Sequence, residues 1–179
     1  MINSLCILMG AGFCAHFILR RINYEKLYNH RYPLLRQAYV RSNISQNPDY
    51  LKFVQENNWW LSDYALFMAL KVHYGYRQWT LWENEHRDCQ SARTHAGEFE
   101  AEMGFWKWVQ YEFMKQWKAV CDYAHKKGIS IIGDMPIYVA HDSMDVWRAP
   151  EQFLLDENYN PTVVAGCPPD AYSVDGQLW

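Results

Sequence analysis

The sequence has 179 residues. That length suits one ordinary domain but falls short of the about 250 residues of a complete (β/α)8 barrel. The formal net charge is -3, and the Lys and Arg residues are scattered. Because no basic stripe is present to neutralise phosphates, we expect no nucleic-acid partner.

The cysteines and aromatic residues further limit the kinds of protein that this sequence can encode. The five cysteines are widely spread and show no Cys/His ligand spacing, which indicates neither a disulfide scaffold nor a zinc site. A cytoplasmic location is therefore expected, and no metal or organic cofactor is predicted. Aromatic residues make up 17% of the chain. This content suits a protein that stacks on flat apolar ligand faces, and packing of a large core is the alternative explanation.

The first twenty-one residues differ from the rest. Residues 5–19 are apolar apart from two glycines and His16, and the stretch ends at Arg20 and Arg21. It is shorter than the about 20 residues of a membrane helix, and a signal peptide carries its positive charge before the apolar run. A membrane is therefore not an expected partner. A weak membrane anchor and an upstream stretch translated from a misplaced start or a truncated gene both stay open as explanations.

Three helices are predicted in the first half of the remaining chain. Residues 24–41 carry apolar side chains at steps of three and four, as an amphipathic helix requires. Asn47 and Pro48 form an N-cap and a first helical position, which predicts a short helix through residue 54. Residues 62–74 are apolar on every side and end near Gly75. A helix of that kind must be covered by other elements on most of its faces.

The longest predicted helix covers residues 98–127. Six apolar side chains recur on one face, namely Phe105, Val109, Phe113, Trp117, Val120 and Ala124. Lys126 and Lys127 lie in the last turn, where the helix dipole favours cations, and Gly128 is a typical C-terminal stop.

A short strand is predicted at residues 129–132, directly before Gly133 and Asp134. The order helix, glycine, buried strand, acidic residue is typical of an α/β barrel, whose functional side chains project from the C-terminal ends of the strands. Asp134 is a candidate site residue on this ground, and a strand-end Asp that caps the following turn is the structural alternative. The chain beyond it is rich in proline and predicted to be mostly loop.

Several motifs in order resemble one enzyme family. The run GDMPIYVAHDSMDVW over residues 133–147 closely resembles a signature of the 4-α-glucanotransferases, glycoside hydrolase family 77. It is followed by FLLD at 153–156, VAGCPPD at 164–170 and GQLW at 176–179, and family-like sequence also occurs at residues 23–25, 32–36 and 60–71. The resemblance spans about residues 21–179.

The resemblance implies an α/β fold, namely a partial (β/α)8 TIM barrel of the α-amylase type with an inserted helical subdomain, of which this piece is mostly helical. The strand that ends at Asp134 resembles the third barrel strand. We divide the chain into residues 1–21, an apolar segment that is not family-like, and residues 22–179, a fragment of the catalytic barrel with its inserted subdomain.

The implied activity is transfer of an α-1,4-glucan segment to the 4-position of an acceptor sugar by a retaining double displacement, with an α-1,4-glucan or maltooligosaccharide as substrate. The family's nucleophilic Asp and acid/base Glu have no counterpart among these residues, so no catalytic residue is predicted and the chain is expected to be inactive alone. The predicted substrate-binding residues are Asp134, Tyr138, Pro168, Pro169, Asp170 and Tyr172.

Other residues and other functions receive a plainer interpretation. Asp142 and Asp145 are expected to be turn and helix-start acids, and His141 a loop residue rather than a base, because nothing nearby forms a triad with it. Two alternatives to the truncated enzyme stay open: a non-catalytic protein that binds glucans through a remnant groove, and a pseudogene product without a stable fold.

Overall fold

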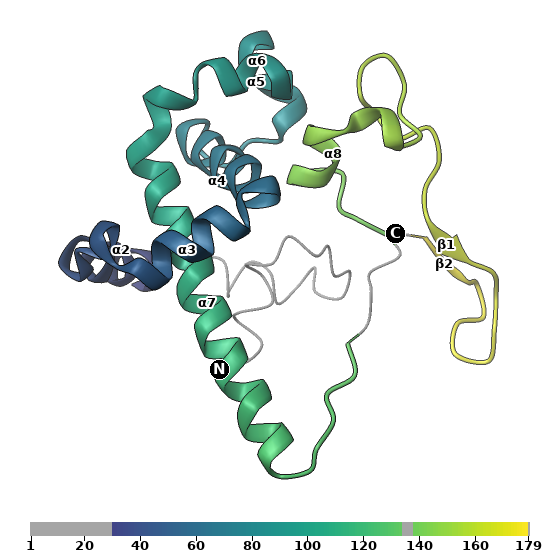
Figure 1. Cartoon of the computed structure of the whole chain (residues 1–179). Helices are drawn as coiled ribbons and strands as arrows, with labels where there is room; N and C mark the ends of the chain where they lie inside the picture. The colour runs from purple at the N-terminus through teal and green to yellow at the C-terminus, as the bar shows by residue number, and fades with distance from the viewer. Residues whose placement is uncertain (1–29, 134–137, 179) are drawn as a thin grey trace.

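The computed structural model describes residues 30–133 and 138–178. This part of the chain is mostly helical, with one small antiparallel sheet in which Gly166 pairs with Leu178 and Cys167 with Gln177 (Figure 1). The α-helices are α2 (Tyr32–Ser42), α3 (Pro48–Glu56), α4 (Asn58–His73), α5 (Asn84–Arg87), α6 (Cys89–Thr94), α7 (Glu100–Lys126) and α8 (Met144–Arg148). The 3-10 turns are η4 (Ile44–Gln46), η5 (Trp79–Leu81), η6 (Ala96–Phe99) and η7 (Pro150–Gln152), and the strands are β1 (Gly166–Cys167) and β2 (Gln177–Leu178).

Helix α4 is the centre of the core. The sequence predicts this helix over residues 62–74, and in the structure it begins four residues earlier, at Asn58, and ends at His73. Gly75, with a positive φ of 59°, closes the helix. Most of its side chains are buried on all sides, as its uniformly apolar sequence requires. It packs chiefly against α7, where Phe105 and Trp106 are almost completely buried.

The short helix α3 starts as the sequence predicts. Asn47 Oδ1 accepts hydrogen bonds from the backbone N–H groups of Asp49 at 2.9 Å and Tyr50 at 3.0 Å, and Pro48 occupies the first turn. The helix predicted over residues 24–41 is confirmed as α2 in its later part, and its expected start lies outside the described residues.

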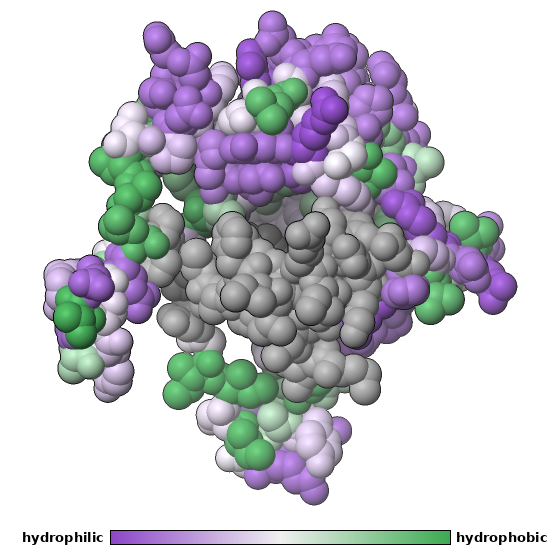
Figure 2. Space-filling view, turned by 180° about the vertical axis from the view of Figure 1, so that it is seen from behind, coloured by the Kyte–Doolittle hydropathy of each residue, from purple (hydrophilic) through white to green (hydrophobic). Residues whose placement is uncertain are grey.

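Helix α7 is confirmed over nearly its whole predicted length, but its apolar face is only half covered. Phe105, Val109 and Phe113 are buried, whereas Trp117 is 38% exposed and Val120 is exposed. Figure 1 shows why, since the last turns of α7 extend beyond α2, α3 and α4. Apolar surface also appears at this lower end of the molecule when it is viewed from behind (Figure 2).

The strand predicted at residues 129–132 is wrong for this structure. Residues 129–133 follow α7 in neither a helix nor a strand, and the side chain of Ile132 is 94% exposed. A buried parallel strand requires a neighbour on each side to satisfy its backbone N–H and C=O groups. In the described part of the chain the only sheet is the two-residue pairing of β1 with β2, so those neighbours are missing.

The C-terminal part returns to the helical core through α8. Val146 and Trp147 are buried against it, and the Trp147 ring centroid lies 5.5 Å from that of Phe67 on α4. The Trp147 Nε1–H donates to the backbone oxygen of His86 at 3.0 Å, which ties α8 to α5. Among the described residues, no helix has the length and apolar character needed to cross a membrane.

Candidate functional site

Asp134, the residue predicted at the end of the barrel strand, lies outside the described residues. The described chain resumes at Tyr138, whose side chain is 52% exposed. Residues 138–143 then lead into α8, so the contacts of this segment show how the chain after Asp134 is held.

An ion pair fixes this segment to the helical core. Lys71 Nζ, on the last turns of α4, lies 2.7 Å from Asp142 Oδ2 and also donates to the backbone oxygens of Tyr76 and Arg77 at 3.2 and 2.8 Å. Asp142 Oδ1 accepts a further hydrogen bond from the backbone N–H of Trp79 at 3.2 Å. Asp142 therefore joins two segments that are far apart in the sequence, which is more than the local turn predicted for it.

Both ring nitrogens and the carbonyl oxygen of His141 are engaged in hydrogen bonds. Its Nε2 lies 2.6 Å from the backbone oxygen of Tyr159, which can only accept, so Nε2 carries the proton. Nδ1 then accepts from the amide of Gln78 at 2.8 Å, and the His141 carbonyl accepts from Trp79 Nε1 at 2.9 Å. The prediction of a loop residue is confirmed, with a positioning role added to it.

Helix α8 begins at Met144, and its N-cap is Ser143 rather than Asp142. The Ser143 hydroxyl accepts from the backbone N–H of Val146 at 3.4 Å, and Asp145 lies in the first turn, as a helix-start acid should. Burial raises the pKa of Asp145 above its usual range, although Arg148 opposes the shift. Asp145 is therefore a structural residue of α8.

Four of the predicted binding residues lie together in the loop that joins β1 to β2. Asp170 organises this loop, since its Oδ1 accepts from the backbone N–H groups of Tyr172 and Ser173, both at 2.8 Å. The Asp170 N–H in turn donates to the Ser173 oxygen at 2.9 Å. The carboxylate thus holds its own loop, and all of these hydrogen bonds lie within it.

The remaining loop residues stiffen the turn and present one aromatic ring. Pro168 and Pro169 are exposed and have fixed φ angles, and Gly176 closes the loop with a φ of 71°. A Cβ at Gly176 would lie 2.5 Å from the Cys167 oxygen, so only glycine fits there. The side chain of Tyr172 is 98% exposed. The loop therefore offers a free phenol ring on a short, internally bonded backbone.

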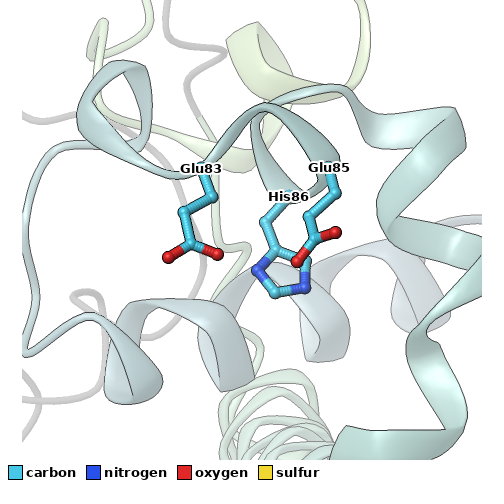
Figure 3. A group of neighbouring side chains, drawn as sticks. All are labelled: Glu83, Glu85 and His86. Atoms are coloured by element: carbon cyan, nitrogen blue, oxygen red, sulfur yellow. The ribbon is translucent and has the colours of Figure 1, made fainter.

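A separate group of side chains of the kinds that bind metal ions lies at and just before α5. Single ligand atoms of Glu83, Glu85 and His86 lie within 4.8 Å of one another, and Figure 3 shows the three side chains leaving the same turn toward the same side. His86 is buried, and its Nδ1 lies 2.7 Å from the Tyr74 hydroxyl. Burial is the main cause that lowers the pKa of His86, which favours the neutral ring. The expectation of no metal cofactor stays a prediction.

Sequence reasoning missed Lys71 and Gln78 as positioning residues. Lys71 had one usable signal, because it is a charged residue that directly follows the apolar run at residues 64–70, and a buried lysine requires a partner. Nothing in the local sequence indicated Gln78, whose partner His141 lies 63 residues further on.

Comparisons with known proteins all point to the same family. The sequence profile of the family described as 4-alpha-glucanotransferase matches residues 8–179. The match thus begins inside the apolar segment 1–21, and the division of the chain at residue 21 stays a prediction. The chain is 44% identical over 161 residues to the 4-alpha-glucanotransferase of Clostridium butyricum, and 41% identical over 168 residues to that of Thermus thermophilus.

A solved structure agrees with these relatives. The chain resembles an amylomaltase from Streptococcus agalactiae in complex with acarbose, with a TM-score of 0.75 and 34% sequence identity, over 98% of this chain and 38% of that one. The two sequence relatives cover 88% and 89% of this chain, which spans 33% of the length of each. Because both the profile and these relatives match nearly the whole chain, the chain belongs to the 4-alpha-glucanotransferase family.

Proposed function

We propose that this chain forms a substrate-binding part of a 4-α-glucanotransferase. The enzyme transfers a segment of an α-1,4-glucan to the 4-position of an acceptor glucose or glucan. The observation that carries the proposal is the agreement over 98% of the chain with an amylomaltase in complex with acarbose. A maltooligosaccharide is therefore the expected ligand, and the cytoplasm is the expected compartment.

In this proposal, the chain binds the glucan, and the rest of the family fold supplies the catalytic carboxylates. Retaining transfer requires a nucleophilic carboxylate and an acid/base carboxylate about 5–5.5 Å apart across the scissile bond. The family resemblance assigns neither of them to these residues. What the chain supplies is binding and orientation of the glucan, which lowers the barrier by holding the reacting bond in place.

Asp134 is assigned to the sugar at the reacting centre. In our proposal residues 129–132 complete the third strand of a partial (β/α)8 barrel when neighbouring strands flank them, which brings Asp134 to the C-terminal edge of that barrel. The exposure of Ile129, Ile131 and Ile132 supports this, because three apolar side chains are left for other elements to cover.

The loop between β1 and β2 is assigned to the rim of the glucan groove. Asp170 acts there by holding the loop, and Tyr172 offers an exposed ring and hydroxyl to a sugar. Two adjacent prolines reduce the entropy lost when the loop is ordered by a ligand. Tyr138 is the second exposed phenol assigned to the substrate.

A chimera tests the proposal. The segment of the Clostridium butyricum relative that matches this chain is replaced by the corresponding residues of this chain, and conversion of maltotriose to longer maltooligosaccharides is measured. We expect the chimera to transfer glucan, and the 179-residue chain alone to leave maltotriose unchanged. A chimera that folds, as judged by circular dichroism, yet forms no longer product contradicts the proposed function.

Variants of the chimera separate the two roles. Asp134→Ala is expected to lower kcat by about 10²–10³, the usual loss for one preorganised transition-state contact. Asp170→Ala loosens the rim loop and is expected to raise KM more than it lowers kcat. Asp170→Asn is the matched control, since its side-chain oxygen still accepts the two backbone hydrogen bonds and KM should change little.

A further inference from the structure

A hollow beside the start of α4 has the features of a carbohydrate site, and the proposed function does not use it. Its volume is about 410 Å³, and its rim includes Asn58, Trp59 and Ser62 from the first turns of the helix. A volume of this size falls in the range of small-molecule sites. In Figure 1, α4 lies apart from the loop between β1 and β2, and none of the residues that line the hollow belongs to that loop.

Trp59 is the feature that points to a ligand. Its side chain is 71% exposed, whereas the adjacent Trp60 is half-buried and donates its Nε1–H to Asn57 Oδ1 at 3.1 Å. An indole left in solvent at the edge of a hollow can stack on a flat apolar surface. The C–H face of a glucose ring is such a surface, and its hydroxyl groups remain free for the polar side chains around it.

The polar wall of the hollow is rigid and carries matched donors and acceptors. Asp63 Oδ1 and Oδ2 accept from Arg93 Nε at 2.9 Å and Nη2 at 2.8 Å, and Arg148 Nε lies 3.1 Å from the same carboxylate. Among the described residues, the terminal nitrogens of Arg148 make no hydrogen bond. They are therefore available to donate to the oxygens of a ligand.

The rest of the lining suits a sugar. Leu66 and Met103 form an apolar floor, and the Ser62 hydroxyl donates to Asn58 Oδ1 at 2.5 Å, which holds both groups at the rim. Alternating hydroxyl, amide, carboxylate and guanidinium groups pair well with the vicinal hydroxyls of a sugar, each of which both donates and accepts. A small anion would use only the donors and would face the Asp63 carboxylate.

We propose that this hollow is a second α-glucan site, in which Trp59 stacks on one glucose unit and Arg148 binds its hydroxyls. The ligand class rests on the proposed function. The site would hold a long glucan away from the reacting bond, so it acts on chain-length preference rather than on the transfer step.

Binding by the chain itself tests the site. Maltoheptaose is titrated into the 179-residue protein by calorimetry, and Trp59→Ala is expected to raise Kd by about tenfold, which corresponds to about 1.4 kcal/mol. Tyr123→Ala is the matched control, because Tyr123 is another exposed aromatic residue, located on the far turns of α7. The control should leave Kd unchanged. An equal Kd for Trp59→Ala, or no heat with maltoheptaose, overturns the proposal.

Two further arms separate this proposal from its alternatives. Inorganic phosphate should not compete with maltoheptaose, and competition would identify an anion site instead. In the chimera, Trp59→Ala should reduce the rate on amylose while leaving the rate on maltotriose unchanged, and equal loss on both would overturn the chain-length role. An inactive chimera with Trp59-dependent maltoheptaose binding would refute the proposed transfer function but not this site.

Discussion

Lys71 is the residue on which the anchoring of the 138–143 segment depends most. Its nearly buried ammonium group donates to two backbone oxygens and to Asp142. Lys71→Met would leave these acceptors without their donor, and leaving a buried polar group unpaired costs about 1–3 kcal/mol. We expect that loss of unfolding free energy, measured by urea denaturation.

Lys52→Met is the control for this prediction. Lys52 also forms an ion pair, with Glu56 at 3.8 Å, but both side chains are exposed and adjacent on one helix. An exposed pair of this kind contributes about 0–1 kcal/mol. If both substitutions had the same small effect, the Lys71 contacts would not stabilise the fold.

His86 makes stability depend on pH. Burial lowers its folded pKa first of all, His73 and His95 lower it further, and Glu85 and Glu83 act in the opposite direction. Since the unfolded histidine has a pKa of about 6.5, the unfolded chain takes up the proton first on acidification. This contribution to stability is therefore present above that pH and is lost as the pH falls below it.

The measurement is the urea midpoint between pH 7.5 and 5. His86→Gln is expected to flatten the decline on the acid side. His125→Gln, at an exposed position near the end of α7, is expected to leave the decline as it is. If the urea midpoint of His86→Gln falls with pH as steeply as that of the unsubstituted chain, groups other than His86 cause the loss of stability.

At the scale of the element, α7 is one helix with two different environments. Phe113 is buried, and Trp117, one turn later on the same face, is partly exposed. Phe113→Ala is expected to cost about 3–5 kcal/mol, as removal of a buried aromatic ring does. Trp117→Ala should lower the free energy of unfolding clearly less in this chain. Similar urea midpoints for the two variants would contradict the division of α7 into a buried part and an exposed part.

The same helix shows what its sequence could and could not predict. Apolar residues at steps of three and four predicted a helix and the face that packs, because both follow from local geometry. The point at which that face becomes exposed depends on where α2, α3 and α4 end. Those ends are set by Asn43, Asn57 and Gly75, which carry no information about α7.

Residues 129–132 show the limit of strand prediction. Three isoleucines have strong strand propensity, but a strand exists only as a pair, and its partners are not encoded in the segment itself. For the candidate site the limit is similar. The sequence predicted the β1–β2 loop residues from a motif, yet the Lys71–Asp142 contact joins positions 71 residues apart that nothing local connects.

At the scale of the whole molecule, the described chain consists of a helical core and a C-terminal part that closes back on it. The core is rich in aromatic rings, among them Trp79, Trp82 and Trp106, and α8 adds Trp147 to it. The high aromatic content seen in the sequence is thus used largely for packing. Trp59, which is 71% exposed, is the aromatic residue that the proposed second glucan site uses.

The irregular, exposed stretch after α7 has a consequence for digestion by a protease. Backbone of this kind is the preferred site of limited proteolysis, so proteinase K should cut within residues 129–133 before it cuts the helices. The two pieces should nevertheless migrate together in gel filtration, because the Lys71–Asp142 ion pair and the packing of Trp147 against Phe67 each join residues on opposite sides of the cut. They should part only when denaturant is added, and separation in native buffer would show that α8 does not hold the C-terminal piece to the core.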